Sequence, residues 1–310
     1  MLKFTQHLIE KYSTFVREGF QSLLPWRLTP RDQSAWFTRE QRFLYTRIAI
    51  LIANVLWLAF AFAGFKGFPF WYGGFVFFFW LAFGLLNYTH KSSVWLAHKR
   101  VWLFILLYLA LAGISFFIDI FGVNHHLWFY PFYHGAGMLW VWLVLYPFGG
   151  LAVLELLYFL GGCLGEPLTF KECSMTKWHG FFDVLEHVLF LTVTGVIIAD
   201  ALWPGFEVSL PITISLFLIW LGIALIKLSF YIRHLGHCSL VILSIVLLAL
   251  LLHELPNTVA REWIYLEAPL SSFFNAFLFG LPVWMWVGWF WLVLLPLRIW
   301  IFLAVHPNVK

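Results

Sequence analysis

Long runs with almost no charge constrain this chain more than any other feature. Between Val101 and Val123, for example, Asp119 is the only charged residue. An α-helix needs about 20 mostly apolar residues to cross a bilayer. The 310-residue chain is 62% hydrophobic and only 11% charged, whereas soluble domains carry about 25% charged residues. The sequence therefore predicts an integral membrane protein built of helices, which satisfy their backbone hydrogen bonds internally.

We expect an all-α, polytopic bundle of eight spans, at about 43–64, 68–88, 100–121, 135–164, 180–202, 208–232, 237–254 and 271–303. The fourth and eighth spans are long and contain prolines, which predicts kinks or breaks at Pro147, Pro282 and Pro296. The expected units are an amphipathic N-terminal segment (1–42), a first four-helix half (43–164), a linker (165–179), a second four-helix half (180–303) and a tail (304–310).

The distribution of Lys and Arg predicts the orientation of these spans. Cations gather in the N-terminal segment and in the loops after the second, fourth and sixth spans, which hold Lys91, Lys99, Arg100, Lys171, Lys177 and Arg233. The alternate loops hold only Lys66 and Arg261. Because cytoplasmic loops are enriched in cations, we expect a multi-pass protein of the cytoplasmic (inner) membrane, with the N-terminal segment, the linker and both termini in the cytoplasm.

The two halves share a pattern that indicates an internal duplication. Asp119 stands nine residues before Trp128, and Glu254 stands nine residues before Trp263; each tryptophan begins a Trp-x-Tyr triplet. The same shift of 135 residues roughly places the first four spans on the last four. Four helices in each half would give two repeats of parallel topology.

Polar residues gather in two belts, one near each membrane surface. The belt on the non-cytoplasmic side, called here the Asp119 belt, contains Asp119, Asn124, His125, His126, His134, Asp200, His253, Glu254, Arg261 and Glu262. One interpretation is that these residues lie at the headgroup level. The other is that Asp119 and Glu254 face each other, so that one carboxyl group stays neutral and can donate a proton.

The belt on the cytoplasmic side, called here the Glu186 belt, contains His90, His98, Glu155, His179, Asp183, Glu186, His187, Lys227, His234 and His237. His179, Asp183, Glu186 and His187 share one face of a helix, because each residue advances about 100°. Ionisable groups in a span need a partner, a cavity or a metal. Our candidates for acid–base catalysis are Glu155, Asp183 and Glu186.

The same belt is a candidate metal centre. Imidazole and carboxylate groups suit non-haem iron or zinc, and the candidate ligands are His179, Asp183, His187, His234 and His237. The HxxxH and HxxHH boxes of membrane di-iron enzymes are absent from the sequence. A hydrogen-bonded polar core and a path for transport or protons are the alternative interpretations.

Two short segments resemble enzymes that modify carotenoids. The segment GLAVLELLYFL, which begins at Gly150, resembles the acidic segment of membrane lycopene cyclases, and Glu155 matches one of its two acids. The segment from Glu262 to Phe290 is similar to the C-terminal part of polytopic carotenoid hydratases, through Gly280, Pro282, Gly288 and Trp289. The resemblance implies chemistry on a long polyene or isoprenoid, in which a neutral acid protonates a C=C bond and aromatic faces stabilise the cation.

The first hypothesis for function is thus a membrane-embedded enzyme that acts on a hydrophobic lipid or isoprenoid. A non-catalytic subunit of a larger membrane complex, binding pigment, haem or lipid, and a secondary transporter are the alternatives. A transporter requires a polar path between the two belts, whereas an enzyme requires a pocket at one of them. The expected partners are membrane lipids, a hydrophobic small molecule and other membrane subunits, and nucleic acid is not expected.

Overall fold

The computed structural model describes residues 39–89, 101–163, 177–203, 206, 210–231, 250–268, 275–278 and 281–305. These residues are mostly helical, and five of the helices are long and apolar enough to cross a membrane. The prediction of a helical membrane protein is confirmed at this level. The predicted amphipathic helix at the N-terminus lies outside the described residues, as do the linker up to residue 176 and the tail from residue 306.

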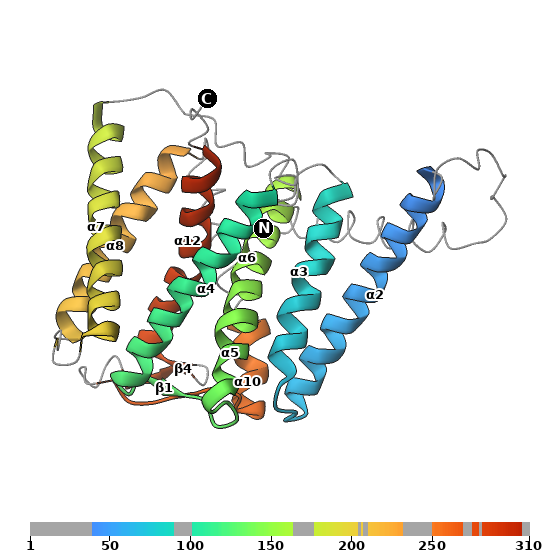
Figure 1. The fold of residues 1–310 in the computed structure, drawn as a ribbon, viewed down its shortest axis with the longest axis horizontal. Coiled ribbons are helices and arrows are strands. Elements are labelled where there is room, and N and C mark those ends of the chain that lie inside the picture. The colour runs from blue at the N-terminus through green and yellow to red at the C-terminus, as the bar shows by residue number, and fades with distance from the viewer. Residues whose placement is uncertain are drawn as a thin grey trace.

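The elements follow one another as α2 (Arg39–Phe65), α3 (Trp71–Thr89), α4 (Val101–Asn124), β1 (Trp128–Phe129), η3 (Gly135–Gly137), α5 (Met138–Trp140), η4 (Val141–Leu145), α6 (Tyr146–Cys163), α7 (Lys177–Leu202), α8 (Leu210–Tyr231), η5 (Leu250–Glu254), α10 (Leu255–Ala260), β2 (Ile264–Tyr265), β3 (Phe277–Leu278), β4 (Leu281–Pro282) and α12 (Val283–Val305). Helix α2 lies at one end of the molecule and the α7–α8 pair at the other, with α3, α4, α6 and α12 between them (Figure 1).

The five helices that can span a membrane lie at Leu44–Phe65, Trp71–Tyr88, Trp102–Asn124, Gly135–Leu160 and Gly180–Leu202. They match the first five expected spans within a few residues. Helix α8 occupies the position of the sixth, and most of the seventh lies outside the described residues. Surface exposure separates the outer helices from the inner ones, because only 22% of the first span and 17% of the fifth are buried, against 67% of the fourth.

Proline shapes the two long spans in different ways. Before Pro147 the helix widens into the π-helical turn η4 and then continues as α6, which accommodates a residue that has no N–H group to donate. The last span was expected from residue 271, but helix α12 begins only at Val283. The residues directly before it form an antiparallel pair in which Phe277 lies opposite Pro282. Pro296 lies inside α12 without ending it.

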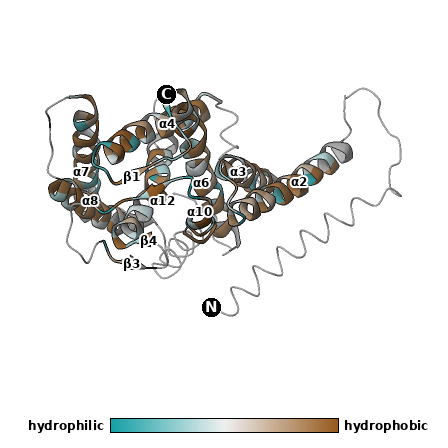
Figure 2. Cartoon of the chain, turned by 90° about the horizontal axis from the view of Figure 1, so that it is seen from below, coloured by the Kyte–Doolittle hydropathy of each residue, from teal (hydrophilic) through white to brown (hydrophobic). Residues whose placement is uncertain are grey.

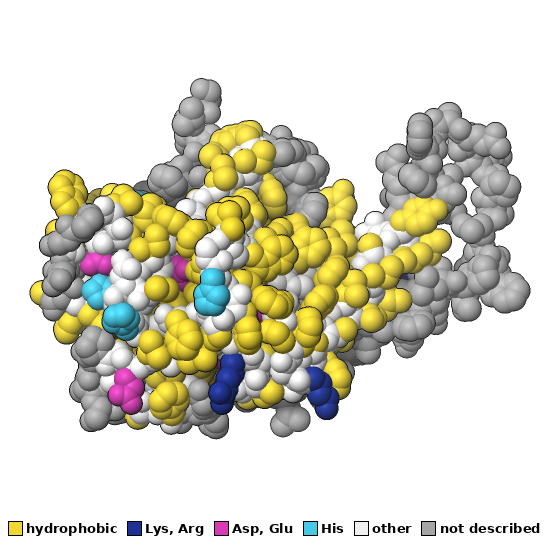
Figure 3. Space-filling view, turned by 60° about the horizontal axis from the view of Figure 1, so that its bottom comes forward, with side chains coloured by type: hydrophobic (Ala, Val, Ile, Leu, Met, Phe, Trp, Pro, Cys, Tyr) yellow, Lys and Arg dark blue, Asp and Glu magenta, His cyan; other side chains and the backbone are white. Residues whose placement is uncertain are grey.

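The surface is what a lipid environment requires. Hydropathic colouring is predominantly apolar along the helices (Figure 2). The face seen in Figure 3 is largely covered by hydrophobic side chains, with few charged ones among them. The buried core contains aromatic and aliphatic side chains from the inner helices, among them Trp71, Phe75, Leu107, Val141 and Leu154.

A buried ion pair joins the α7–α8 pair to α12. The Arg298 Nε atom lies 2.7 Å from Oε1 and 2.8 Å from Oε2 of Glu186. The indole N–H of Trp220 in α8 also donates to Oε1, at 3.1 Å. The Glu186 side chain is fully buried and that of Arg298 is 11% exposed. Three helices therefore meet at one carboxylate.

We predict that Glu186→Leu lowers the free energy of unfolding by about 3–5 kcal/mol, because it leaves the Arg298 charge buried without its partner. The double variant Glu186→Leu with Arg298→Leu removes both charges and should recover most of that loss. Thermal unfolding in detergent, followed by tryptophan fluorescence, measures both. Equal loss in the single and double variants would show that the ion pair does not hold these helices together.

Candidate functional site

A carboxylate and a tryptophan nine residues apart are hydrogen-bonded in each half of the chain. The Trp128 indole N–H donates to Oδ1 of Asp119 at 3.0 Å, and the Trp263 indole N–H donates to Oε2 of Glu254 at 3.2 Å. Asp119 is 1% exposed and Glu254 is 2% exposed. The sequence pattern that suggested a duplication therefore corresponds to the same contact made twice.

The two motifs also contact each other directly. Strands β1 and β2 pair antiparallel, with Trp128 opposite Tyr265 and Phe129 opposite Ile264. Phe129 and Ile264 are the middle residues of the two Trp-x-Tyr triplets. Each tryptophan position therefore faces the tyrosine position of the other triplet, which is the register that a local two-fold axis through the middle residues produces.

Each carboxylate also accepts hydrogen bonds from further side chains. Asp119 accepts a hydrogen bond from the Trp142 indole at Oδ2, at 2.8 Å, and one from the Tyr146 hydroxyl at Oδ1, at 3.5 Å. Glu254 accepts at Oε1 from the Tyr265 hydroxyl, at 2.6 Å, and from the Trp289 indole, at 2.9 Å. Buried polar groups need such partners, because leaving one unpaired in an apolar setting costs about 1–3 kcal/mol.

Trp142 and Trp289 were not among the candidate site residues, although Trp289 belongs to the resemblance to carotenoid hydratases, and a repeated segment could have identified both. Residues 140–147 and 289–296 both read Trp-x-Trp-Leu-Val-Leu-x-Pro. The first copy follows Asp119 and the second follows Glu254, so each half contains the acid, the Trp-x-Tyr triplet and this segment in the same order. The spacing differs between the halves, which is why a constant shift of 135 residues does not align the segments.

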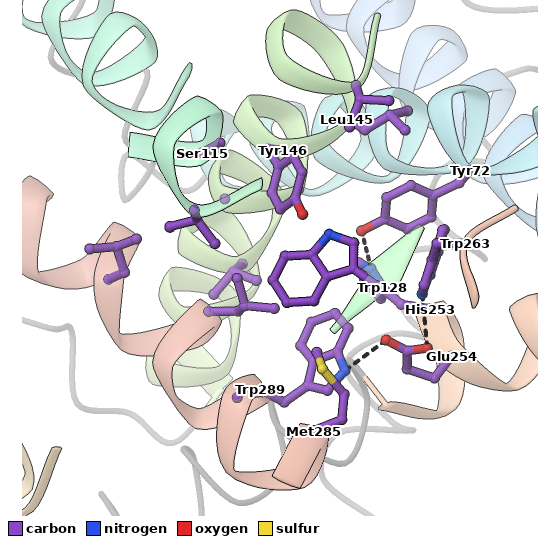
Figure 4. Close-up of a pocket in the computed structure, with 18 of the residues that line it drawn as sticks. Tyr72, Ser115, Trp128, Leu145, Tyr146, His253, Glu254, Trp263, Met285 and Trp289 are labelled. Carbon is purple, nitrogen blue, oxygen red and sulfur yellow. Dashed lines mark hydrogen bonds between the residues drawn. The ribbon is translucent and has the colours of Figure 1, made fainter. Parts of the chain in front are cut away.

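An elongated cavity of about 190 Å³ lies among these groups. Its walls come from α3, α4, β1, η4, α6, η5, β2, α12 and the loop residues around β1 and β2 (Figure 4). They are lined by Tyr72, Leu111, Ser115, Ile118, Trp128, Tyr130, Val141, Leu145, Tyr146, Gly149, Gly150, Val153, His253, Glu254, Trp263, Tyr265, Trp284, Met285, Gly288, Trp289, Leu292, Leu295 and Pro296. Such a mostly apolar pocket with a few convergent polar groups is typical of small-molecule sites.

The two acids differ in their access to the cavity. Glu254 is one of the lining residues, whereas Asp119 is not, and its partners Trp128 and Tyr146 are. The Tyr146 hydroxyl is also 2.9 Å from the hydroxyl of Tyr130. Asp119 therefore holds Trp128 and Tyr146 in the cavity wall without lining the cavity itself, whereas Glu254 can contact a molecule in the cavity.

A second polar pair lies beside Glu254. The Tyr72 hydroxyl and Nδ1 of His253 are 2.6 Å apart, and one of the two donates to the other. The His253 ring lies edge-on against Phe75 and Trp289, with ring centres 5.1 and 5.2 Å apart. Both His253 and Glu254 stand on the π-helical turn η5, and turns of this kind occur frequently at functional sites.

Glu262 positions Tyr72 from outside the spans. Its Oε2 accepts the backbone N–H of Tyr72 at 3.1 Å, and its Oε1 accepts the hydroxyl proton of Tyr133. Tyr72 is in the first turn of α3, where backbone N–H groups have no partner within the helix. Glu262 is completely buried, and this burial raises its pKa from the ordinary 4.5 to about 7, against the opposite effect of its hydrogen bonds to Tyr133, Tyr72 and Phe70.

The side chain of Asn257 shapes the turn that carries Glu262 and Trp263. Its Oδ1 accepts the backbone N–H groups of both residues, at 2.9 and 3.2 Å, and its Nδ2 donates to the Trp263 carbonyl at 2.8 Å. Arg261, directly before Glu262, adopts a left-handed backbone conformation with φ of 53°. This buried amide therefore fixes the path from α10 to β2.

The remaining histidines selected in the Asp119 belt lie apart from the cavity. His125 Nε2 is 3.1 Å from Oδ2 of Asp200, which joins the ends of α4 and α7. His126 is exposed and has a positive φ of 52°. The candidate site residues in this belt are Asp119, His125, His126, His253 and Glu254. The structure brings Asp119, His253 and Glu254 to one site and places the two loop histidines elsewhere.

The candidates of the Glu186 belt are distributed over separate contacts. Glu155 is fully buried and accepts a hydrogen bond from the Asn87 amide at 2.8 Å, while Glu186 binds Arg298. His187 Nδ1 lies 2.6 Å from the Asp183 carbonyl oxygen, 3.8 Å from Oδ1 of Asp183 and 3.7 Å from Oε2 of Glu186. Glu155 and Glu186 thus each have a polar partner on a neighbouring helix.

The proposed metal centre remains a prediction. His234 and His237 lie outside the described residues, as does the side chain of His179. Among the residues that the structure describes, no group of three or more His, Cys, Asp or Glu is arranged to hold a metal ion. Iron or zinc coordination by this belt would therefore depend on residues in the undescribed segments.

Comparison of the chain with protein-family models, with curated proteins and with solved structures gave no match. The resemblance to lycopene cyclases and carotenoid hydratases stays a prediction, and the geometry of the site is the basis for a functional proposal.

The packing of Trp128 beside Asp119 can be tested at Gly122, because a methyl group on this residue would overlap the indole ring of Trp128. We predict that Gly122→Ala lowers the free energy of unfolding by about 1–3 kcal/mol, as overpacking does in cores, and changes the near-UV circular dichroism of the displaced indole. Gly113→Ala is the matched control, since a methyl group there on the same helix has nothing within 4 Å. Equal stability and equal spectra in the two variants would contradict the assigned packing.

Glu262 predicts a pH dependence of stability. With a pKa of about 7 when folded and 4.5 as its ordinary value, the folded state keeps a proton that the unfolded state has lost between those values. Stability from this group is therefore complete below pH 4.5 and is lost as the pH rises through 7, by about 3 kcal/mol in all. Glu262→Gln imitates the neutral acid and should not show this loss.

Thermal unfolding of wild type and Glu262→Gln between pH 5 and pH 8 measures the effect. The wild type should lose stability relative to the variant as the pH rises. Glu267→Gln serves as control, because Glu267 is exposed on the same loop. Parallel pH profiles of the wild type and Glu262→Gln would refute the raised pKa.

Proposed function

We propose that the protein is a membrane-embedded enzyme in which Glu254 protonates a C=C bond of a hydrophobic, isoprenoid-like substrate. The observation that carries this proposal is a single carboxyl group on the wall of an otherwise apolar, aromatic-rich cavity. This places the acid in the Asp119 belt, whereas our first choice from the sequence was Glu155, Asp183 and Glu186. Those three carboxyl groups are not among the residues that line the cavity.

The aromatic walls support a reaction with a cationic intermediate. Trp128, Trp263, Trp284 and Trp289 all line the cavity, together with four tyrosines. The negative face of an indole attracts a cation most strongly among the aromatic side chains. A positive charge that develops on a carbon chain would thus be stabilised by the indole faces, beside the Glu254 carboxylate that the proton transfer leaves.

The proposed step is balanced without an external oxidant or reductant. The Glu254 carboxyl proton forms a C–H bond with one carbon of the double bond, and the π electrons leave a cation on the other carbon. Attack by water, followed by loss of a proton to the Glu254 carboxylate, gives a hydration product. Attack by a second double bond, followed by the same loss of a proton, gives a ring. Loss of a proton from a neighbouring carbon without any attack gives a shifted double bond.

We also infer that the two four-helix halves arose by duplication and that one acid kept access to the cavity while the other became structural. Three observations support the inference: the repeated acid–tryptophan bond, the symmetric pairing of β1 with β2 and the repeated segment that ends in Pro147 and Pro296. Eight spans, with both termini in the cytoplasm of an inner membrane, remain the arrangement we propose from the charge distribution.

The transporter alternative requires polar groups that continue from one belt to the other. The described contacts favour the enzyme, because Glu186 is bound to Arg298 and Trp220 and Glu155 to Asn87. The cavity lining on α6 and α12 includes aliphatic side chains such as Val153, Leu292 and Leu295, which offer no polar group toward the Glu186 belt. A non-catalytic subunit that binds a pigment would use the same cavity without needing the acid.

The test is incorporation of deuterium from heavy water into isoprenoid lipids by the full chain in membranes, measured by mass spectrometry. We expect Glu254→Gln to reduce incorporation at least about 100-fold, the usual contribution of a general acid. Glu155→Gln is the matched control, because it changes the acid that the sequence favoured and keeps an acceptor for Asn87. Loss of incorporation in Glu155→Gln alone would move the acid to the Glu186 belt, and retention in Glu254→Gln would end the proposal.

A further inference from the structure

Polar and apolar groups are separated along the cavity. Tyr72, His253, Glu254 and Trp263 gather along one side in Figure 4, around Trp128, where α3 begins and η5 ends. The opposite end is formed by aliphatic residues of α4, α6 and α12. On α12 alone, the lining runs from Trp284 to Pro296, a distance of about 18 Å at 1.5 Å per residue.

The charge around the polar end has one sign. Glu254 lines the cavity and Asp119 lies behind its wall, while no Lys or Arg is among the lining residues that the structure describes. The loops expected on that side of the membrane contain only two cations, Lys66 and Arg261, and both are exposed. Lys66 lies over the ring of Phe62, with its Nζ 5.3 Å from the ring centre. Phosphate recognition commonly uses Arg or Lys, and the described lining offers neither cation. The backbone N–H of Tyr72, at the start of α3, is already bound to Glu262.

The polar end does offer partners for an uncharged oxygen. The Tyr72 hydroxyl, already bound to His253, lies close to Gly149, where an added Cβ would be 3.5 Å from it. Its oxygen can donate or accept one further hydrogen bond. Glu254 provides a second partner on the same side (Figure 4). Two adjacent groups of this kind suit a hydroxyl group, which is both a donor and an acceptor.

We propose that the cavity binds a neutral, single-chain isoprenoid alcohol, with its hydroxyl group between Tyr72 and Glu254 and its chain along α4, α6 and α12, and that it excludes the corresponding phosphate esters. This inference rests on the proposal that the cavity is the substrate site. In this arrangement the hydroxyl group lies at the polar end of the cavity, and the chain extends away from it. The reacting double bond is then the one within reach of Glu254, close to the alcohol end.

Binding of matched probes to the full chain in nanodiscs tests the inference, with quenching of the cavity tryptophans as the signal. The probes are geraniol, geranyl diphosphate, the hydrocarbon in which hydrogen replaces the hydroxyl group, and a saturated straight-chain alcohol of equal length. We expect geraniol to bind at least about tenfold more tightly than the diphosphate, because the anion meets a negative site in a low-dielectric environment.

Two variants locate the hydroxyl group. Tyr72→Phe should weaken the binding of geraniol about tenfold, as loss of one buried hydrogen bond does, and leave the binding of the hydrocarbon unchanged. Tyr88→Phe, at the exposed far end of the same helix, should change neither. The diphosphate ratio is measured on the wild type and therefore tests the inference even if Tyr72→Phe does not fold.

Each result decides the proposal. Equal or tighter binding of the diphosphate, equal binding of the hydrocarbon, or no binding of any probe would overturn it. Tighter binding of the saturated alcohol would assign the cavity to acyl chains instead. Because deuterium incorporation is measured separately, a normal probe pattern with an active Glu254→Gln refutes the proposed chemistry alone. The reverse combination refutes only the ligand assigned here.

Discussion

The hydrogen bonds from tryptophan to two buried carboxylates are the interactions on which the described core depends. Asp119 and Glu254 are almost completely removed from water, in helices that otherwise face hydrocarbon. Each acid can remain there only because several N–H and O–H groups converge on it. The donors come from segments far apart in the chain, so satisfying two side chains brings α4, β1, η4, β2 and α12 together and leaves the cavity between them.

The same contacts explain why one site has two unequal acids. The β1–β2 pairing places the two Trp-x-Tyr triplets symmetrically, but the segments that follow differ in length between the halves. Trp142 reaches Asp119 from its own half, and Trp289 reaches Glu254 from a position two residues earlier in the repeated segment. The shift leaves Glu254 on the cavity wall. The two acids of one repeated pattern thus have different access to the cavity.

Two further buried acids, one within a span and one outside the spans, show that a buried carboxyl group is accompanied by ionic or hydrogen-bonding partners. Glu186 binds Arg298 across helices, and Glu262 holds the first turn of α3 through the backbone of Tyr72. Sequence reasoning found Glu186 because it shares a helix face with His179, Asp183 and His187. It could not find Arg298, which is 112 residues away and follows no local pattern. The ion pair gives the Glu186 face a structural role, in line with the hydrogen-bonded polar core that was one of its interpretations.

The sequence by itself determined the class of protein and the positions of five helices that can span a membrane. The length of an apolar run and its lack of charge are local properties, and they decide whether a helix can cross a bilayer. The sequence also marked Asp119, Trp128, Glu254 and Trp263 through their spacing. The tertiary structure alone decided which acid meets the cavity, that Tyr72 and His253 stand beside it, and that Glu186 is paired with Arg298. Those outcomes depend on distances between helices remote in sequence, and hydrophobic periodicity contains no information about which polar side chains meet.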